Sequence, residues 1–488
     1  MSFERRTVAA WRLVRARRVA VVVIVIALAG CAVGPDYRGP APSPLPAQYR
    51  ALDAGMSADP AADRWWELLA DPLLSALVAE ALADNPDLAA AEARVRESRA
   101  LARAAGAGFL PSLNASGRIS RDKLSLNGEN LALIPITPPV TAFTDYRVGL
   151  DAAWEIDLAG HTHRQVEAAV ARFGSRAETS NDARVVVAAE VGSAYVDYRV
   201  AAARLELARR TLATLEESAR LVGLQQQAGL ASESDLKAAD AERLSSAGLP
   251  ATLEASRLAA ELRLAALTGQ ATTALAPRLE AVSAIPAVPA KAPVGLPAEL
   301  LRRRPDIRGA ERELAAATAD VGSAIAAQFP RLSLVGDAGF DSVRSGDLTS
   351  AASRFWNFGP QLTVPLFAGG RLHRQTEAAK AGQEAALAVY RGTVLRAMSE
   401  AETAVVRFAA SRRDAAGLDS AAGQLAGRAA LERRRYDAGD ISMLEVLLAE
   451  RASNRAADQR AESAGRLALD FVALQKALGG GWQTAEAR

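Results

Sequence analysis

Few residues of this chain are of the types that carry out catalysis or bind metal ions. The 488 residues include only three histidines and one cysteine. His161, His163 and His373 lie at the starts of predicted long helices, and no further His or Cys stands near them. Helical metal ligands favour i,i+4 spacing, so we expect these histidines to be polar helix-start residues and we expect no metal site. Nucleophile-elbow and phosphate-loop motifs do not occur in the sequence, so we predict that the protein is not an enzyme.

The single cysteine, Cys31, lies in a setting that suits covalent modification. Residues 1–30 combine six arginines with an apolar run at 19–29, which is shorter than the roughly 20 residues of a membrane-spanning helix. The sequence Leu-Ala-Gly-Cys at 28–31 resembles a bacterial lipobox. We therefore predict a lipoprotein signal peptide at 1–30 and a covalent lipid on Cys31 as the only cofactor; a retained signal anchor and a free thiol are the alternatives. One cysteine also excludes an internal disulfide.

The basic charge of the chain is concentrated in this leader. The leader holds six Arg and one Glu, a net charge of +5, so its removal takes the formal charge from +2 to −3. The remaining charge balance does not favour a nucleic-acid partner.

The other candidate site residues lie in two short turns. The sequence YDAGDISMLE at 436–445 interrupts a tail of helix-forming residues that has no proline after Pro365. In each turn a glycine able to end a helix precedes a serine, and an acid follows three residues later as in a capping box. These residues are Gly439, Ser442 and Glu445 in one turn and Gly229, Ser232 and Asp235 in the other. Capping alone leaves Tyr436 and Asp440 without a role.

The two turns belong to a duplication of nearly the whole chain. Asn85-Pro-Asp returns as Arg304-Pro-Asp at an offset of 219 residues, and Ala228-Gly returns as Ala438-Gly at an offset of 210. We therefore predict a first repeat at 65–277 and a second at 297–481, joined by a Pro/Ala-rich extended linker at 278–296. An extended lipid-anchored segment at 31–64 and a tail at 482–488 complete the organisation.

Each repeat has the order helix, strand pair, long helix, helix. Alternating apolar and polar residues predict strands at about 112–121, 144–155, 331–341 and 355–367. Proline-poor, Ala-rich runs predict long helices at about 162–227, 232–268, 371–436 and 442–478. A run of about 65 residues forms a helix on the order of 100 Å long. The predicted class is an α+β membrane protein built from a duplicated unit.

The strands fit a transmembrane β-barrel, because they are about ten residues long with one apolar face and aromatic residues near their ends. Hairpins packed on the helices are the alternative, and Pro360 and Pro365 weaken the last strand. Four strands cannot close a barrel, and an unpaired edge is not tolerated in lipid. Two copies would give eight strands filled by side chains, whereas three copies would give twelve strands with room for a channel. Conduction therefore favours a trimer.

Several segments resemble the outer-membrane efflux proteins, the TolC-like channels of the lipoprotein branch that includes OprM and NodT. They are Cys31 with GPDY at 34–37, the stretches 71–95 and 301–334, WEIDLAG at 154–160, VPLFAGG at 364–370 and RRYDAGDIS at 434–442. The resemblance covers nearly the whole mature chain. It implies a homotrimer in the outer membrane, with a 12-stranded β-barrel continuous with a long periplasmic α-helical barrel.

The resemblance further implies the passive exit channel of a tripartite efflux pump. Small toxic or drug-like molecules would arrive from an inner-membrane pump of the RND class through a periplasmic adaptor, the membrane fusion protein. A type I protein secretion duct is the alternative within transport. A non-conducting, lipid-anchored helical scaffold is the alternative from a different class.

The resemblance also gives the turns a role. It implies that they lie at the periplasmic tip, where Tyr436, Asp440 and Glu445 line a closed aperture. The remaining turn residues, Gly229, Ser232, Asp235, Gly439 and Ser442, would contact the adaptor. Leu448 stands where the family has a second acid, and Pro250, which the second copy lacks, is expected to kink or end its helix.

Overall fold

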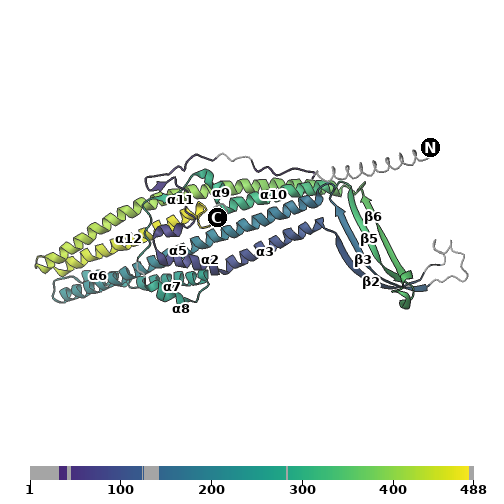
Figure 1. The fold of residues 1–488 in the computed structure, drawn as a ribbon. Coiled ribbons are helices and arrows are strands. Elements are labelled where there is room, and N and C mark those ends of the chain that lie inside the picture. Colours follow the sequence, from purple (N-terminus) through teal and green to yellow (C-terminus); the bar gives the residue numbers. More distant parts are fainter. Residues whose placement is uncertain (1–31, 41–44, 124, 126–141, 282–283, 483–488) are drawn as a thin grey trace, which may run out of the picture. The chain divides into compact units, whose positions relative to one another are not determined.

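The computed structural model describes residues 32–40, 45–123, 125, 142–281 and 284–482 (Figure 1). The expected signal peptide, Cys31 and all of the expected tail except Trp482 lie outside these ranges. Contacts divide the chain into two units. The first holds the described residues of Met1–Pro40, Arg96–Gly174 and Glu311–Ala388, and the second holds those of Ala41–Val95, Ser175–Ala310 and Val389–Arg488. Each unit contains parts of both repeats, so the compact units do not coincide with the repeats.

The first unit contains a four-stranded antiparallel sheet. Its strands are β2 (Ser112–Lys123), β3 (Ala142–Ile156), β5 (Arg331–Ser342) and β6 (Arg354–Thr363). They lie in the order β2-β3-β5-β6, as Figure 1 shows. The last strand ends four residues before the predicted position, at Thr363. In the second unit, the short strands β1 (Met56–Ser57) and β4 (Ala292–Pro293) pair in parallel.

The strand register follows the duplication. Ser112 lies opposite Ala153 in the first hairpin, and Arg331 lies opposite Thr363 in the second. Adding 219 to the first residue and 210 to the second converts one pair into the other. The two offsets read from the sequence therefore describe the same paired geometry in both repeats.

The helices account for most of the remaining residues. They are α2 (Pro72–Asp84), α3 (Pro86–Gly106), α5 (His161–Gln227), α6 (Glu233–Ser246), α7 (Leu249–Thr268), α8 (Thr272–Glu280), α9 (Leu300–Arg303), α10 (Pro305–Ala326), α11 (Arg371–Asp437) and α12 (Met443–Ala477). Short 3₁₀ segments lie at η1 (Trp65–Leu69), η2 (Ala107–Phe109), η3 (Pro297–Glu299), η4 (Ser345–Asp347) and η5 (Ala351–Ser353). Within the described part of the chain, no helix combines the length and the apolar character needed to cross a membrane.

Two predicted segments differ from the structure. The single helix expected at about 232–268 is divided into α6 and α7, with Gly248 as the N-cap of α7 and Pro250 in its first turn. Proline lacks an N–H donor and is tolerated at the start of a helix, so Pro250 begins a helix here. The linker expected at 278–296 is only partly extended, because its first residues form the end of α8, while β4 within it is extended and paired.

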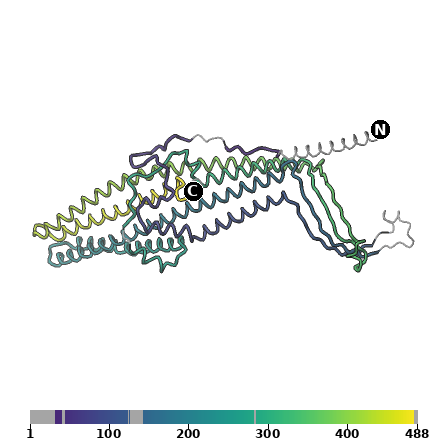
Figure 2. Tube along the Cα trace, in the orientation of Figure 1, coloured from purple at the N-terminus to yellow at the C-terminus, as the bar shows by residue number. Residues whose placement is uncertain are grey.

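The core of the second unit is formed by aromatic and aliphatic side chains. Trp65 is fully buried and packs edge-on against Trp66, with ring centroids 5.7 Å apart, and against Phe471 at 6.4 Å. Small residues let the long helices approach them: a Cβ atom on Gly192 of α5 would lie 2.6 Å from the Trp65 ring. Figure 2 shows that α11 turns back into α12, and ion pairs such as Arg433–Glu450 at 3.6 Å join the two helices.

An equivalent contact, which we call the helix-end joint, holds the C-terminal end of α7 in the first repeat and of α12 in the second. In the first repeat, Asn85 Nδ2 donates a hydrogen bond to the Leu267 carbonyl at 2.9 Å. In the second, Arg304 Nη1 donates one to the Ala477 carbonyl at 3.0 Å. The two donors differ by 219 residues and the two acceptors by 210, so the duplication has conserved the contact while its side chain changed.

A glycine completes each joint. Gly269 and Gly479 take positive φ values of 67° and 76°. A Cβ atom on them would lie 3.1 Å from the Asp84 carbonyl oxygen and 2.9 Å from that of Arg303. Both the left-handed backbone and the close carbonyl therefore require glycine.

The substitution Gly479→Ala tests this joint. We expect it to lower the unfolding free energy by about 1–2 kcal/mol, because alanine is strained in the left-handed region and its methyl group meets the Arg303 carbonyl. The measurement is the thermal midpoint of the purified protein. Gly423→Ala, on an open surface of α11, is the matched control and should leave the midpoint unchanged or raise it. Equal effects of the two substitutions on the thermal midpoint would contradict the requirement for glycine at position 479.

Candidate channel surfaces and turn sites

The four-stranded sheet has one polar and one apolar face. The register places Arg147, Gly149 and Asp151 on one face, opposite Asp341, Gly339 and Asp337. The other face carries a set of large apolar side chains, each at least half exposed: Leu113, Ile119, Val148, Leu150, Trp356, Phe358 and Leu362. An exposed apolar surface of this extent is not expected in water and indicates contact with lipid or protein.

Charged and polar groups pair with one another on the polar face. Arg147 Nη2 lies 2.8 Å from Asp337 Oδ2, and the guanidinium carbon lies 4.1 Å from the centroid of the Phe355 ring. Ser116 donates a hydrogen bond of 2.7 Å to Asp151. This face is therefore suited to line water.

The sheet has two open edges. β2 and β6 are its outer strands, and no strand of the described residues pairs with their outer sides. Each edge presents a row of backbone donors and acceptors, which is a template for pairing with another chain.

The turn between α11 and α12 is a glycine-ended helix followed by a capping box. Gly439 has a φ of 81°, and the backbone N–H groups of Gly439 and Asp440 donate to the carbonyls of Tyr436 and Arg435, both at 2.8 Å. The side chains of Ser442 and Glu445 then cap the first turn of α12 reciprocally. This turn has the structure that its sequence predicts.

The turn between α5 and α6 repeats these features. Gly229 has a φ of 70°, and Leu230 N–H donates to the Gln225 carbonyl at 2.8 Å. Ser232 and Asp235 form the capping box of α6.

The acids of the two turns differ in what they contact. Hydrogen bonds from the Ser442 backbone and hydroxyl lower the pKa of Glu445, and bonds from the Ser232 hydroxyl and backbone lower the pKa of Asp235. The Asp440 side chain is exposed and forms no hydrogen bond or ion pair with any other residue that the structure describes. The structure thus joins Ser442 with Glu445 and leaves the Asp440 side chain open to solvent, and Tyr436 is 36% exposed.

The three histidines have ordinary structural surroundings. His161 Nδ1 lies 3.1 Å from the Ser323 carbonyl, the His163 backbone N–H donates to Asp157, and His373 Nε2 lies 3.3 Å from Glu377. Among the described residues, no group of three or more His, Cys, Asp or Glu side chains is placed to hold a metal ion.

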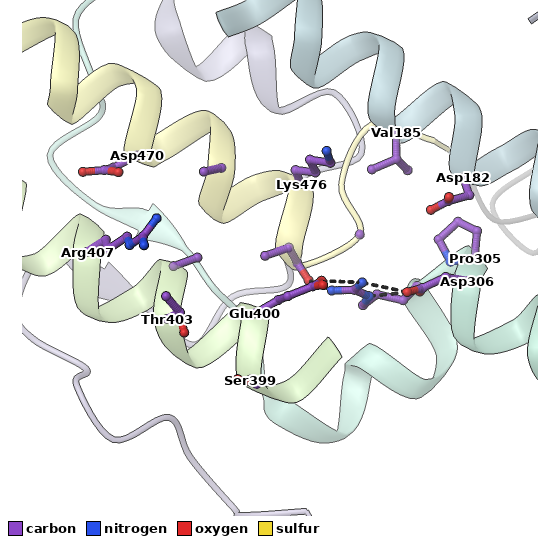
Figure 3. Close-up of a pocket in the computed structure, with 15 residues that line it drawn as sticks. Asp182, Val185, Pro305, Asp306, Ser399, Glu400, Thr403, Arg407, Asp470 and Lys476 are labelled. Atoms are coloured by element: carbon purple, nitrogen blue, oxygen red, sulfur yellow. Dashed lines mark hydrogen bonds and ion pairs between the residues drawn. The ribbon is translucent and has the colours of Figure 1, made fainter. Parts of the chain in front are cut away.

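The second unit contains a cavity of about 400 Å³ that the sequence did not indicate (Figure 3). It lies where α5, α10, α11 and α12 meet. Arg304 borders it, with hydrogen bonds of 2.7 Å to Asp306 and 2.8 Å to Glu400 besides the bond to the Ala477 carbonyl. Burial acts to lower the pKa of Arg304, but Asp306 and Glu400 hold it above its usual value.

Another wall of the cavity carries a carboxylate without such support. Burial, together with the nearby Asp306 charge, raises the pKa of Asp182, and Arg304 and Lys476 only partly oppose this. The sequence signal that could have indicated this cavity was the divergence of the two repeats. The first copy has Asn85 for Arg304 and Ala266 for Lys476, so these two basic groups belong to the second copy alone.

Comparison with known proteins places the chain in a family. A family model described as outer membrane efflux protein matches residues 77–270 and 296–480. Outer membrane protein OprJ of Pseudomonas aeruginosa is 33% identical over 481 residues, covering 95% of this chain and 96% of that protein. Nodulation protein T of Rhizobium leguminosarum bv. viciae is 31% identical over 471 residues, covering 95% and 94%. The solved structure of the outer-membrane channel OprN superposes with a TM-score of 0.82 at 34% identity, covering 93% of this chain and 100% of that one.

A sheet with an exposed apolar face and a polar face, continued by helices of 67 residues, defines a channel subunit of the bacterial outer membrane. The chain belongs to the outer membrane efflux protein family, as the sequence resemblance predicted. It is located in the outer membrane and functions as the channel of an efflux pump. Members of this family are channels rather than enzymes.

The cavity gives a pH-dependent prediction. An acid whose pKa is raised by folding contributes stability while it is protonated, and that stability is lost as the pH rises through the folded pKa. We therefore expect Asp182→Asn to raise the thermal midpoint at neutral pH, with a gain that shrinks as the pH falls toward the ordinary aspartate value of 3.8. Asp59→Asn, at an exposed site, is the control and should have little effect. A gain from Asp182→Asn that does not change with pH would contradict the electrostatic explanation.

Proposed function

We propose that three copies of the chain close their sheets into a 12-stranded β-barrel that continues into a periplasmic α-helical barrel. The exposed apolar face of the sheet, together with its two open edges, is the observation that carries the proposal. Backbone groups at a sheet edge must be paired inside a membrane, and four strands are too few to pair them within one chain. Twelve strands leave room for an aqueous lumen lined by the polar face.

Transport through this barrel is passive. The polar face provides a path for water and solutes, and the energy comes from the partner pump. We propose small toxic or drug-like molecules as the cargo, an RND-type pump in the inner membrane as their source and a periplasmic adaptor as the link. The exposed turns at Gly229, Ser232, Asp235, Gly439 and Ser442 are the proposed adaptor contacts, because their caps hold two similar turns in a defined shape.

A lipid on Cys31 would add a membrane anchor near the end of the sheet. The residues that follow it are held on the first unit, where Val33 N–H donates to the Ala159 carbonyl at 3.0 Å. Arg164, whose side chain is 4% exposed, lies 2.7 Å from Asp36. The described residues that follow Cys31 therefore lie at the corner between β3 and α5, which supports an anchor there.

Ion conductance tests the channel directly. We expect the purified full-length protein to migrate as a trimer in mild detergent and to conduct ions across a planar lipid bilayer. A trimer without conductance would support the non-conducting scaffold, and a monomer would contradict the proposed barrel.

We further propose that Tyr436, Asp440 and Glu445 line a periplasmic aperture. In a trimer three Asp440 carboxylates surround the axis, where like charges repel and attract cations. We expect Asp440→Asn to raise single-channel conductance and to weaken the preference for cations. Glu445→Gln should act instead through the turn, because its carboxylate caps Ser442.

Ser442→Ala separates the two effects, since it removes the same capping box and leaves both acids in place. It should reproduce the effect of Glu445→Gln and not that of Asp440→Asn. Unchanged conductance and selectivity in both acid variants would contradict the aperture.

A further inference from the structure

The pairing of β3 with β5 joins the two repeats inside one chain. Here the second strand of one repeat lies against the first strand of the other, with Tyr146 opposite Ser342 and Ile156 opposite Leu332. The two open edges of the sheet also belong to a second strand and a first strand. β6 is the second strand of its repeat and β2 is the first strand of its own.

The structure allows residues of the two repeats to be matched one to one. The hairpin β2·β3 becomes β5·β6 when 219 is added on the first strand and 210 on the second, and all ten pairs of β5·β6 obey this rule. The position of a residue on β3 therefore identifies its equivalent on β6, and a residue on β5 identifies its equivalent on β2.

We propose that β6 of one copy pairs with β2 of the next copy in the register that the β3·β5 pairing specifies. This inference rests on the proposed trimer and adds the residue-level seam between its subunits. Ala153 opposite Val335 becomes Thr363 opposite Ser116 of the next copy. In the same way, Asp151 opposite Asp337 becomes Gln361 opposite Arg118, and Ile156 opposite Leu332 becomes Leu366 opposite Leu113.

The two faces of the sheet continue across this seam. Thr363, Gln361 and Asn357 of the polar face meet Ser116, Arg118 and Asp122, which share the polar face of β2. Apolar Leu362 and Leu366 meet Gly117 and Leu113 on the other face. A shift of one residue would place Thr363 and Gln361 opposite residues of the other face of β2, such as Ala115, Gly117 or Ile119, which the alternation of a strand disfavours in a two-faced sheet.

The end of β6 supports the same register. Trp154 to Ile156 form the last part of β3 and pair with β5, whereas their equivalents at 364–366 lie beyond the end of β6. Leu366 is 91% exposed and its proposed partner Leu113 is 67% exposed. Residues 364–366 therefore have the sequence position of a strand but lack a neighbour, and the next copy supplies that neighbour.

The seam differs from the β3·β5 pairing in its polar contacts. The ion pair Arg147–Asp337 between β3 and β5 corresponds to Asn357 and Arg118 at the seam. An amide that accepts from a guanidinium replaces a charged pair, so the seam depends more on backbone pairing and on the apolar row.

Paired cysteines test the register. In the full-length protein, Thr363→Cys with Ser116→Cys places two thiols directly opposite each other across the seam. Opposite residues in an antiparallel pair lie about 4.5–5.5 Å apart between Cα atoms, within the range that a disulfide bridges. We expect oxidation to link the chains covalently, giving dimers and trimers on a denaturing, non-reducing gel.

Two shifted pairs serve as matched controls. Thr363→Cys with Asn114→Cys, or with Arg118→Cys, keeps both thiols on the polar face but displaces one of them by two residues. That displacement separates the Cα atoms by about 8 Å, so we expect about tenfold less linked chain. Preferential linking of either shifted pair would overturn the register.

The controls also separate this inference from the trimer. If each variant remains trimeric in mild detergent and none of the three pairs links, the subunits do not join through these edges in the proposed register. If wild-type protein is monomeric, the proposed trimer fails and the seam fails with it.

Discussion

The open edges of a four-stranded sheet are the constraint on which the rest of the structure depends. Strands β2 and β6 each carry a row of backbone groups that no other described strand satisfies. In lipid, where water cannot replace the missing partners, such groups cost several kcal/mol each. The exposed apolar face that includes Leu150 and Phe358 suits the same environment. This constraint supports the proposed assembly, for which the duplication supplies two strands that are equivalent to the internal pair β3·β5.

The same duplication organises the helices. Asn85 and Arg304 reach equivalent carbonyl groups, and Gly269 and Gly479 allow the same close approach of the backbone. These joints fix where the last helix of each repeat ends. Divergence between the copies then adds a basic side chain in the second copy. Arg304 reaches Glu400 on α11, whereas the shorter Asn85 binds within its joint and caps α3. The two copies have thus kept the geometry of this contact, while the second copy acquired the basic groups Arg304 and Lys476 that border the cavity.

Much of the candidate site was predictable from local signals. Gly439, Ser442 and Glu445 form the helix end and capping box that their spacing predicts, because these contacts join residues at most five positions apart. Asp440 was the residue that capping did not explain, and it is the one whose side chain remains open to solvent. The cavity beside Arg304 was missed because its lining comes from four helices that are far apart in the sequence. The break before α7 was only half predicted, since Pro250 alone does not show whether a helix bends or ends.

The sequence by itself determined the repeats, the order of elements within them, the two-faced strands and the family, because each of these is written in spacing and alternation along the chain. The tertiary structure alone decided that the compact units combine parts of both repeats, which needs contacts between residues hundreds of positions apart. It also decided which charges are paired. Asp337 lies beside Arg147, whereas no residue that the structure describes forms an ion pair with Asp182, although both are aspartates. Local pattern fixes which way a side chain faces, and only the packing of distant segments fixes what it meets there.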